Sequence, residues 1–317
     1  MGTGAGTGAV TGARVAAIDV GTNTTLLLVA EVATSATGDP LVLADRAEIT
    51  RLGRGIGSDG RLGKEGIERT LAVLNDYAAL ARDQGARIAA IGTEALRRAP
   101  NAADFLEPAA RILGAPIDVI TGDREAALTF RAAAASFPRE AAGVMTVVDI
   151  GGGSTEIVIA EAGHITWRGS LPLGSVRLTE RHVHHDPPEP DELSALSRAV
   201  SETLAAVPFP RSGTLIGTAG TVTSLAAMAL KLDDYDAARV HGFRLGAEDL
   251  AWEVARLGRA TAAERESIAG LDPRRADVIG AGALIVAEIT RRAAAAEVLV
   301  SDRGIRWGLL YESLGSR

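Results

Sequence analysis

The sequence predicts a duplicated α/β fold in which two similar domains enclose a cleft. The first observation is a 14-residue segment, 17–30, that aligns without a gap on 147–160. Each copy reads as an apolar strand ending in aspartate, a turn of small residues and a second apolar strand, which is a β-hairpin pattern. Each hairpin is then followed by a third strand and by alternating helices and strands. The length of 317 residues also suits two domains better than one.

The first domain is predicted at 14–128. A helix is expected at about 63–83, because Ile67, Leu71 and Leu74 fall on one face of a helix there. A second helical stretch is expected to end at Leu113. The strands of this domain are expected at about 15–20, 25–32, 41–50, 87–92 and 116–120.

The second domain is predicted at 129–303, with the hinge between the domains near 122–142. A closing helix at 304–314 is expected to pack back on the first domain. Residues 1–13 are uncharged Gly, Thr and Ala repeats, which predict a disordered tail. The strands of the second domain are expected at about 144–150, 155–161, 164–171, 214–217 and 297–300. Its helices are expected near 175–184, 191–206, 221–231, 247–257, 261–269 and 273–293.

Composition excludes several classes of function. Cysteine is absent, which excludes disulfides, thiolate catalysis and thiolate metal sites, and fits a cytoplasmic location. A net charge of −7 argues against a general nucleic-acid binder. The longest apolar stretches are strand-length or carry arginines, so no membrane span is expected. With 47% hydrophobic residues, the chain reads as an ordinary globular protein.

The two hairpin turns are candidate phosphate-binding sites. Turns of Gly, Thr and Ser present backbone N–H groups and hydroxyls to phosphate oxygens. Two such turns, one in each domain, suggest that phosphates are held in the cleft between the domains. The candidate phosphate-binding residues of the two hairpins are Asp19, Thr22, Asn23, Thr24, Gly151, Gly152, Gly153, Ser154 and Thr155.

A third phosphate-type loop follows the strand at 214–217 and opens a helix. Small residues let the backbone approach an anion, and a helix N-terminus favours negative charge. Gly/Thr turns before helices are common, so this loop gains weight only beside the two hairpins. Its candidate residues are Gly217, Thr218, Gly220 and Thr221.

Asp149 and Glu156 are a candidate metal site. With the turn centred between Gly152 and Gly153, these two acids face each other across the hairpin. Like charges directly opposite each other are destabilising, and a divalent cation between them would remove that cost. Oxygen-only ligands suit Mg²⁺ or Mn²⁺.

Further candidates remain open from the residues alone. Asp123 and Glu125 are equally well spaced to activate a water as general base, and acidic residues of an ordinary first helical turn fit them too. Arg97, just past a strand end, could reach a phosphate or lie on a solvated helix face. Three histidines, His182, His184 and His185, precede a polar Asp-Pro-Pro loop and are interpreted as surface or structural rather than as a metal cluster.

The chain resembles the actin, Hsp70 and sugar-kinase superfamily through its twin hairpins and its third loop. More narrowly, it is similar to the exopolyphosphatase / guanosine pentaphosphate phosphatase (Ppx/GppA) family over about 14–314. This resemblance implies two ribonuclease-H-like (actin-like ATPase) domains with a cleft between them. The matching segments are 18–24, 92–97, 121–126, 149–156, 173–178, 217–221, 275–279 and 301–306.

The resemblance also implies roles for single residues. Glu125 matches the general base of the family, and Asp149 and Glu156 match acids beside the metal and the phosphate. Arg124 stands where the family has a second acid, and Trp307 stands where it has a glutamate, so any role of that glutamate is in doubt here. The residues matching terminal-phosphate contacts are Asn23, Arg97, Gly151, Gly153 and Ser154.

We therefore expect an exopolyphosphatase of the short two-domain form that releases terminal orthophosphate from polyphosphate, acting on short chains. Guanosine pentaphosphate is the alternative substrate. A sugar-kinase-like phosphotransferase and a non-catalytic polyphosphate or nucleotide sensor are alternatives of other classes. Mg²⁺ is the expected cofactor, with Mn²⁺ and a monovalent cation as further candidates. A homodimer without nucleic-acid or membrane partners is expected.

Overall fold

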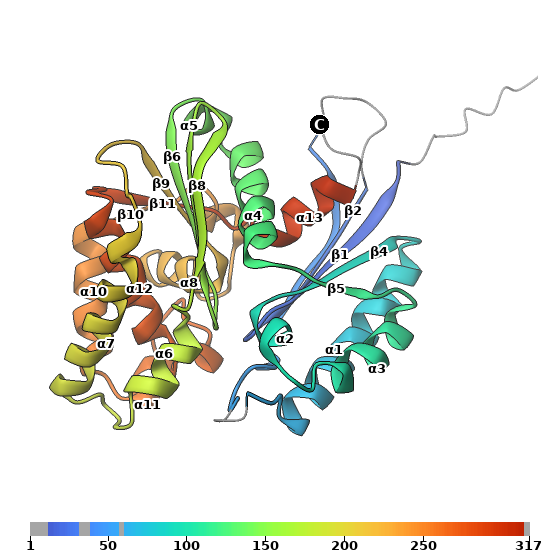
Figure 1. Ribbon diagram of the computed structural model, residues 1–317, viewed down its shortest axis with the longest axis horizontal. Coiled ribbons are helices and arrows are strands. Elements are labelled where there is room, and N and C mark those ends of the chain that lie inside the picture. The colour runs from blue at the N-terminus through green and yellow to red at the C-terminus, as the bar shows by residue number, and fades with distance from the viewer. Residues whose placement is uncertain (1–11, 32–38, 57–59, 314–317) are drawn as a thin grey trace, which may run out of the picture.

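The computed structural model describes residues 12–31, 39–56 and 60–313. Apart from residues 12 and 13, the expected tail at 1–13 therefore lies outside the described residues. Two β-sheets, one in each half of the chain, stand side by side with helices around them (Figure 1). No helix among the described residues is long and apolar enough to cross a membrane.

The first sheet has the strand order β3-β2-β1-β4-β5. The first three strands are antiparallel neighbours, whereas β4 and β5 run parallel to β1. Since β1 is flanked on both sides, it is buried along almost its whole length. The strands are β1 Arg14–Val20, β2 Thr25–Glu31, β3 Leu41–Glu48, β4 Arg87–Gly92 and β5 Ile117–Val119.

The second sheet repeats this order, which confirms the predicted duplication. Its order is β10-β11-β9-β6-β7-β8, so that β8-β7-β6-β9-β11 corresponds to the five strands of the first sheet. The three-residue strand β10 is an unpredicted addition that pairs antiparallel with β11. The strands are β6 Val144–Ile150, β7 Thr155–Glu161, β8 His164–Leu171, β9 Thr214–Thr218, β10 Arg244–Gly246 and β11 Glu297–Val300.

The helices α1 (Lys64–Asp83) and α3 (Ala103–Leu113) cover one face of the first sheet (Figure 1). Leu74 and Tyr77 of α1 and Phe105 of α3 are buried against it. The short helix α2 (Glu94–Arg98) follows directly on β4. The sequence analysis did not predict it as a separate helix. It lies at the carboxyl end of β4, which places it beside the cleft.

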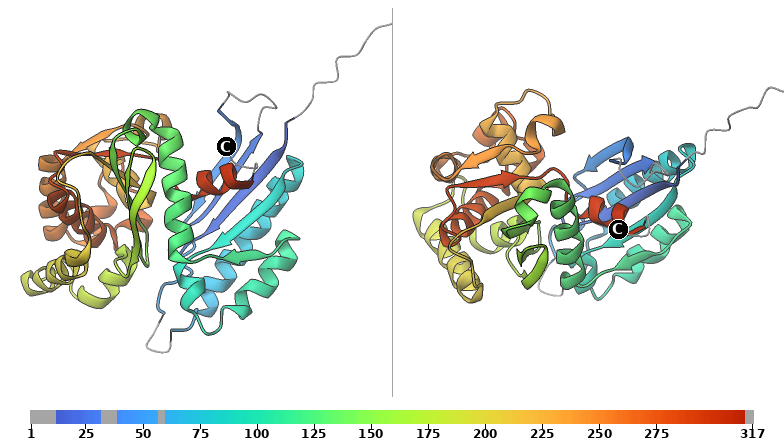
Figure 2. Two further views of the ribbon diagram at one scale, coloured as in Figure 1. Left: turned by 45° about the horizontal axis from the view of Figure 1, so that its top comes forward. Right: turned by 90° about the horizontal axis from the view of Figure 1, so that it is seen from above.

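The segment expected as the hinge, 122–142, is mostly one regular helix. Helix α4 (Gly122–Ser136) lies between the two sheets, beside α13 (Ile305–Ser313), in every view (Figures 1 and 2). Leu128 and Ala132 of α4 pack with α13 and the first sheet. Ala126 and Ala133 pack on the second sheet. The two halves therefore share this helix, which α5 (Pro138–Ala141) follows.

The second half contains the largest hydrophobic core, formed by its sheet and its helices. The predicted helix at 273–293 begins later, because Asp272 caps a 3₁₀ turn at Pro273–Arg275 before α12 starts at Ile279. The four-residue helix α9 was not predicted. The helices are α6 Ser175–His182, α7 Pro190–Thr203, α8 Ala219–Ala229, α9 Ala237–Val240, α10 Ala247–Arg259, α11 Ala262–Glu266 and α12 Ile279–Arg292.

Candidate active site

A cavity of about 650 Å³ lies between the two halves, where the carboxyl ends of β1, β6 and β9 meet. Both hairpin turns and the start of α8 line it. Most of the predicted site residues are therefore brought together at one place. Those that line the cavity are Asp19, Thr22, Asn23, Thr24, Glu125, Asp149, Gly151, Gly152, Gly153, Ser154, Thr218, Gly220 and Thr221.

Four predicted residues lie outside the cavity lining. Arg97 pairs with Glu125, which lines the cavity, and Glu156 lies opposite Asp149, which also lines it. The hydroxyl of Thr155 is buried and donates to the carbonyl oxygen of Leu173, so it supports the turn from inside. Gly217 is enclosed by apolar side chains. Thr155 and Gly217 thus support the local structure and do not face the cavity.

The two hairpin turns have the same geometry and face each other. Gly21 N–H donates to the Thr24 carbonyl at 3.0 Å, and Gly151 N–H donates to the Ser154 carbonyl at 3.0 Å. A Cβ on Gly153 would lie 2.8 Å from the Thr22 hydroxyl across the cleft. The turns therefore approach so closely that a larger residue at this position would force a neighbouring side chain or turn to shift.

The predicted register of the second hairpin is confirmed. Asp149 lies directly opposite Glu156, whereas Asp19 of the first hairpin lies opposite Leu26. Glu156 is almost fully buried and accepts a hydrogen bond from Ser170 at 2.6 Å. Asp149 accepts one from Thr129 of α4 at 3.2 Å. The paired carboxyls are thus held by hydroxyl groups, since Ser154 also forms a hydrogen bond with Glu156.

Four buried carboxyl groups gather at the cleft: Asp19, Glu125 and Asp149 line it, and Glu156 lies opposite Asp149. Burial and the charge of Asp149 raise the pKa of Asp19 to about 7, and burial raises that of Asp149 to about 6. Burial and then Asp149 raise the pKa of Glu156 to about 8. The pKa of Glu125 is raised well above its usual value by burial and then by Glu156. Such mutual repulsion favours a cation in this cluster.

The donor atoms of this cluster suit a hard divalent cation. Oδ1 of Asp19 is buried without a hydrogen-bond partner, and the other available donors are carboxylate oxygens. Among the described residues, no group of three or more His, Asp or Glu side chains is arranged to enclose a metal by itself. Mg²⁺ commonly binds through one or two carboxylates plus substrate phosphates and water, and the Asp149–Glu156 pair fits that mode.

The structure separates the two candidate bases that the sequence left open. Glu125 is buried, lines the cleft and lies 3.3 Å from Nη1 of Arg97. The side chain of Asp123 is 64% exposed and pairs with Arg168 outside the cavity. Of these two acids, only Glu125 therefore faces the cavity between the turns.

Three arginines that the sequence analysis did not assign line the cleft, and two of them, Arg275 and Arg306, contact other residues of its lining. Arg275 lies against the start of α8, where a Cβ on Gly220 would come within 2.4 Å of its Nη1. Its Nη2 donates a hydrogen bond to the Thr24 hydroxyl at 3.3 Å. Arg306 is buried, donates to Asp45 at 3.0 Å and keeps Nε unpartnered. Both lie in segments that matched the family, which was the only signal for them in the sequence.

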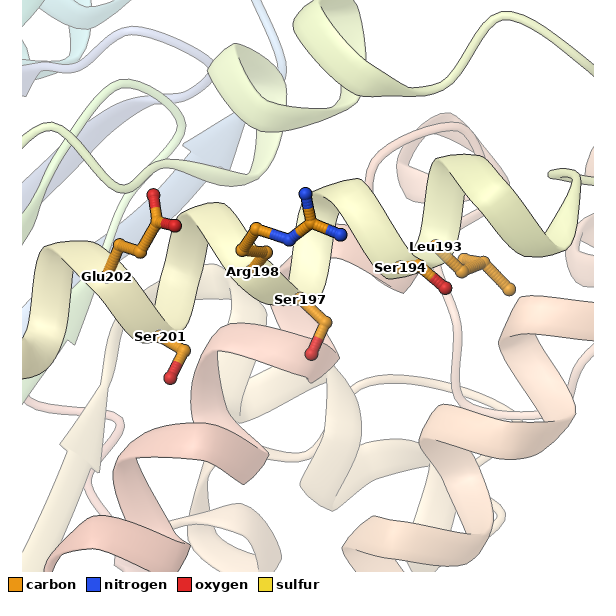
Figure 3. Close-up of a pocket in the computed structure, with 6 residues that line it drawn as sticks. All are labelled: Leu193, Ser194, Ser197, Arg198, Ser201 and Glu202. Atoms are coloured by element: carbon orange, nitrogen blue, oxygen red, sulfur yellow. The ribbon is translucent and has the colours of Figure 1, made fainter.

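The three histidines lie away from the cleft. His185 is an exposed neighbour of Glu192, with 3.1 Å between Nδ1 and Oε1. His182, His184 and His185 do not line the cavity. A second hollow lies on the outer face of α7, and all six of its lining residues come from that helix (Figure 3). It lacks the converging turns and carboxyls of the cleft.

Two domains of equal strand order, with twin phosphate-type turns and buried carboxyls between them, define a phosphate-processing protein of the duplicated ribonuclease-H-like class. The chain belongs to the Ppx/GppA phosphatase family, since the model of that family matches residues 29–317.

It is similar to Exopolyphosphatase 2 of Mycobacterium tuberculosis, with 40% identity over 317 residues covering 95% of this chain and 99% of that protein. It is also similar to the solved structure of the Aquifex aeolicus family member, with 34% identity, a TM-score of 0.81 and coverage of 95% and 97%. A third similar protein is an exopolyphosphatase from Cytophaga hutchinsonii, with 28% identity, a TM-score of 0.87 and coverage of 96% and 99%.

Proposed function

We propose that the chain is an exopolyphosphatase that releases terminal orthophosphate from inorganic polyphosphate. The observation that carries the proposal is the buried Glu125, which faces the cleft between the two phosphate-type turns and lies beside Arg97. The similarity to Exopolyphosphatase 2 over nearly the whole of both chains supports the choice of substrate.

Glu125 activates the attacking water in this proposal. The water oxygen attacks the terminal phosphorus, and its proton passes to the Glu125 carboxylate as the bond to the bridging oxygen breaks. The leaving group is a polyphosphate shorter by one unit. A base works best when its pKa lies near the working pH, and burial moves the pKa of Glu125 upward in that direction.

The terminal phosphoryl group is held by the second turn, through its backbone N–H groups and the Ser154 hydroxyl, and by Arg97. Arg275 and the first turn would contact the next phosphates, since Arg275 already bridges to Thr24. In phosphoryl transfer, most of the rate comes from such positioning and from charge stabilisation. Mg²⁺ held by Asp149 and Glu156 would supply further neutralisation of the phosphate charge.

The outer end of the cleft supports a preference for short chains. Besides Asp19 and Asp149, five aspartates and three arginines line the cavity, so a long polyanion would meet more negative than positive charge there. The aspartates are Asp45, Asp233, Asp234, Asp272 and Asp302, and the arginines are Arg46, Arg275 and Arg306.

Guanosine pentaphosphate is a second candidate substrate, because the same end of the cavity has an apolar part. Leu232, Tyr235 and Leu271 line it, and apolar walls with a few polar groups suit a nucleoside. The catalytic residues would be the same.

One assay tests these functions together. The protein is incubated with polyphosphate, with guanosine pentaphosphate, and with ATP plus glucose, and orthophosphate and sugar phosphate are measured. We expect orthophosphate from short polyphosphate in the presence of Mg²⁺. Sugar phosphate would indicate a phosphotransferase, and binding without any product would indicate a sensor.

We also propose a cytoplasmic homodimer. The absence of cysteine fits a reducing compartment, and the dimer is an expectation from the family. Sedimentation equilibrium of the purified protein tests the dimer. A single species of 32.7 kDa would contradict it.

A further inference from the structure

Glu94 is a buried carboxylate that takes no part in the proposed reaction. It is the first residue of α2, and only 8% of it is exposed. It does not line the cavity, but it lies behind the second hairpin turn, where a Cβ on Gly153 would come within 2.3 Å of its Oε2. The first half of the chain thus places a negative charge directly against the phosphate-type turn of the second half.

Arg177 of α6 ties Glu94 to that turn. Its Nη2 forms an ion pair with Oε1 of Glu94, and its Nε donates to the Gly153 carbonyl at 2.7 Å. Arg98 also contacts Oε1 of Glu94, at 3.2 Å, but it is half exposed and belongs to the same helix. Arg177 is therefore the partner that joins the two halves.

Arg97 lies in the same short helix, three residues after Glu94. A rigid one-and-a-half-turn helix moves as a unit, so whatever fixes Glu94 against Gly153 also fixes Arg97 relative to the turn. This inference rests on the proposed function: we infer that the Glu94–Arg177 ion pair, called the latch below, positions residues of both domains to form the terminal-phosphate site. Neither residue touches the substrate.

The chain contains a matched control for this latch. Arg51 and Asp277 form another ion pair between the two halves, at 3.0 Å, with side chains that are 20% and 37% exposed. Neither residue belongs to α2 or to the second turn. If an ion pair only holds the two halves together, substituting either pair should weaken phosphate binding. If the latch positions the site, only its substitution should do so.

The test compares Glu94→Gln, Arg177→Lys and Asp277→Asn in the full chain. Glu94→Gln keeps the shape and loses the charge, and Arg177→Lys keeps the charge but cannot hold Glu94 and Gly153 in one fork. Tripolyphosphate binding is measured by calorimetry without Mg²⁺, and hydrogen exchange is measured for 94–98 and 151–154. We expect both latch variants to bind about tenfold more weakly and to exchange faster in these segments.

The combination Glu94→Gln with Arg177→Lys should be little worse than either change alone, because both remove one interaction. Unchanged exchange and affinity in the latch variants, or equal changes in Asp277→Asn, would overturn the inference.

The outcomes separate the latch from the proposed function. If the wild-type protein releases no phosphate from polyphosphate but the latch variants still exchange faster and bind tripolyphosphate more weakly, the function is wrong and the latch stands. If the wild type hydrolyses polyphosphate and the latch variants bind and exchange like it, the latch is wrong and the function stands.

Discussion

At the scale of single residues, the site depends on carboxyl groups whose environments differ. Glu125 is paired with Arg97, whereas Asp149 and Glu156 face each other with only hydroxyl partners. An acid beside a guanidinium can act as a base, and two opposed acids favour a cation. The cleft therefore combines a carboxyl group suited to act as a base with a pair of carboxyl groups suited to bind a cation.

Glu125→Gln should lower turnover by about two to four orders of magnitude, the usual scale for loss of a general base. Binding of tripolyphosphate should survive, because no proposed phosphate contact is removed. Single-turnover kinetics with separately measured affinity checks both expectations. Asp123→Asn is the matched control on the same helix and should leave turnover unchanged. Near wild-type turnover in Glu125→Gln would place the base elsewhere.

Glu156→Gln should raise the Mg²⁺ concentration that half-saturates activity, because one of two opposed carboxylates is lost. Without metal, the fold should be unchanged or slightly stabilised, since like charges opposite each other are destabilising. A Mg²⁺ titration of activity and urea unfolding in EDTA measure the two effects. The same half-saturating concentration in both proteins would contradict the metal assignment.

At the scale of elements, the hairpins and the short strands β5 and β11 were predictable, whereas β10 and α9 were not. The register of Asp149 opposite Glu156 follows from the turn centre and from the alternation of strand residues, which are local. Strand β10 has three residues and depends on β11, which is distant in sequence. Arg275 and Glu94 could not be assigned either, because their partners Thr24 and Arg177 come from the other half of the chain.

Gly153→Ala should disrupt the meeting of the two turns. The added Cβ would lie 2.3 Å from Oε2 of Glu94 and 2.8 Å from the Thr22 hydroxyl, so these side chains or one of the turns must shift. Overpacking of this kind costs about 1–3 kcal/mol, and we expect activity to fall more than stability. Gly63→Ala is the control, because nothing lies within 4 Å of a Cβ there. Thermal unfolding and kcat/KM, measured together, check this.

At the scale of the whole molecule, the buried carboxyls make stability depend on pH. Burial raises the pKa of Asp149 to about 6, of Asp19 to about 7 and of Glu156 to about 8. The folded protein therefore keeps protons that the unfolded chain, with carboxyl pKa values of about 4, has already released. Because the folded state binds more protons, the free energy of unfolding falls as the pH rises.

Metal-free protein should accordingly lose stability between about pH 4 and pH 8, with a slope of about 1.4 kcal/mol per pH unit for each retained proton. Mg²⁺ should reduce this loss at the upper end, because it binds the ionised carboxylates. Urea unfolding at several pH values, in EDTA and in Mg²⁺, measures the slope. A curve that rises through this window in EDTA would show that the carboxyls are not buried together.

The acidic outer cleft predicts how activity depends on chain length. We expect efficient cleavage of short oligophosphates, poor processivity on long chains and a shallow salt dependence, because each phosphate neutralised by a basic group adds salt sensitivity. Measuring kcat/KM from tripolyphosphate to chains of hundreds of units, at two salt concentrations, checks this. A steep rise with length that disappears at high salt would indicate a basic channel instead.

Helix α4 contributes one face to each core, through Leu128 and Ala132 on one side and Ala126 and Ala133 on the other. Neither half could be produced alone without exposing an apolar face of this helix or losing it. The two lobes should consequently melt as one cooperative unit, with a single calorimetric transition despite their duplicated architecture. The proposed base, Glu125, lies on this shared helix, so unfolding of either half would also disturb the site.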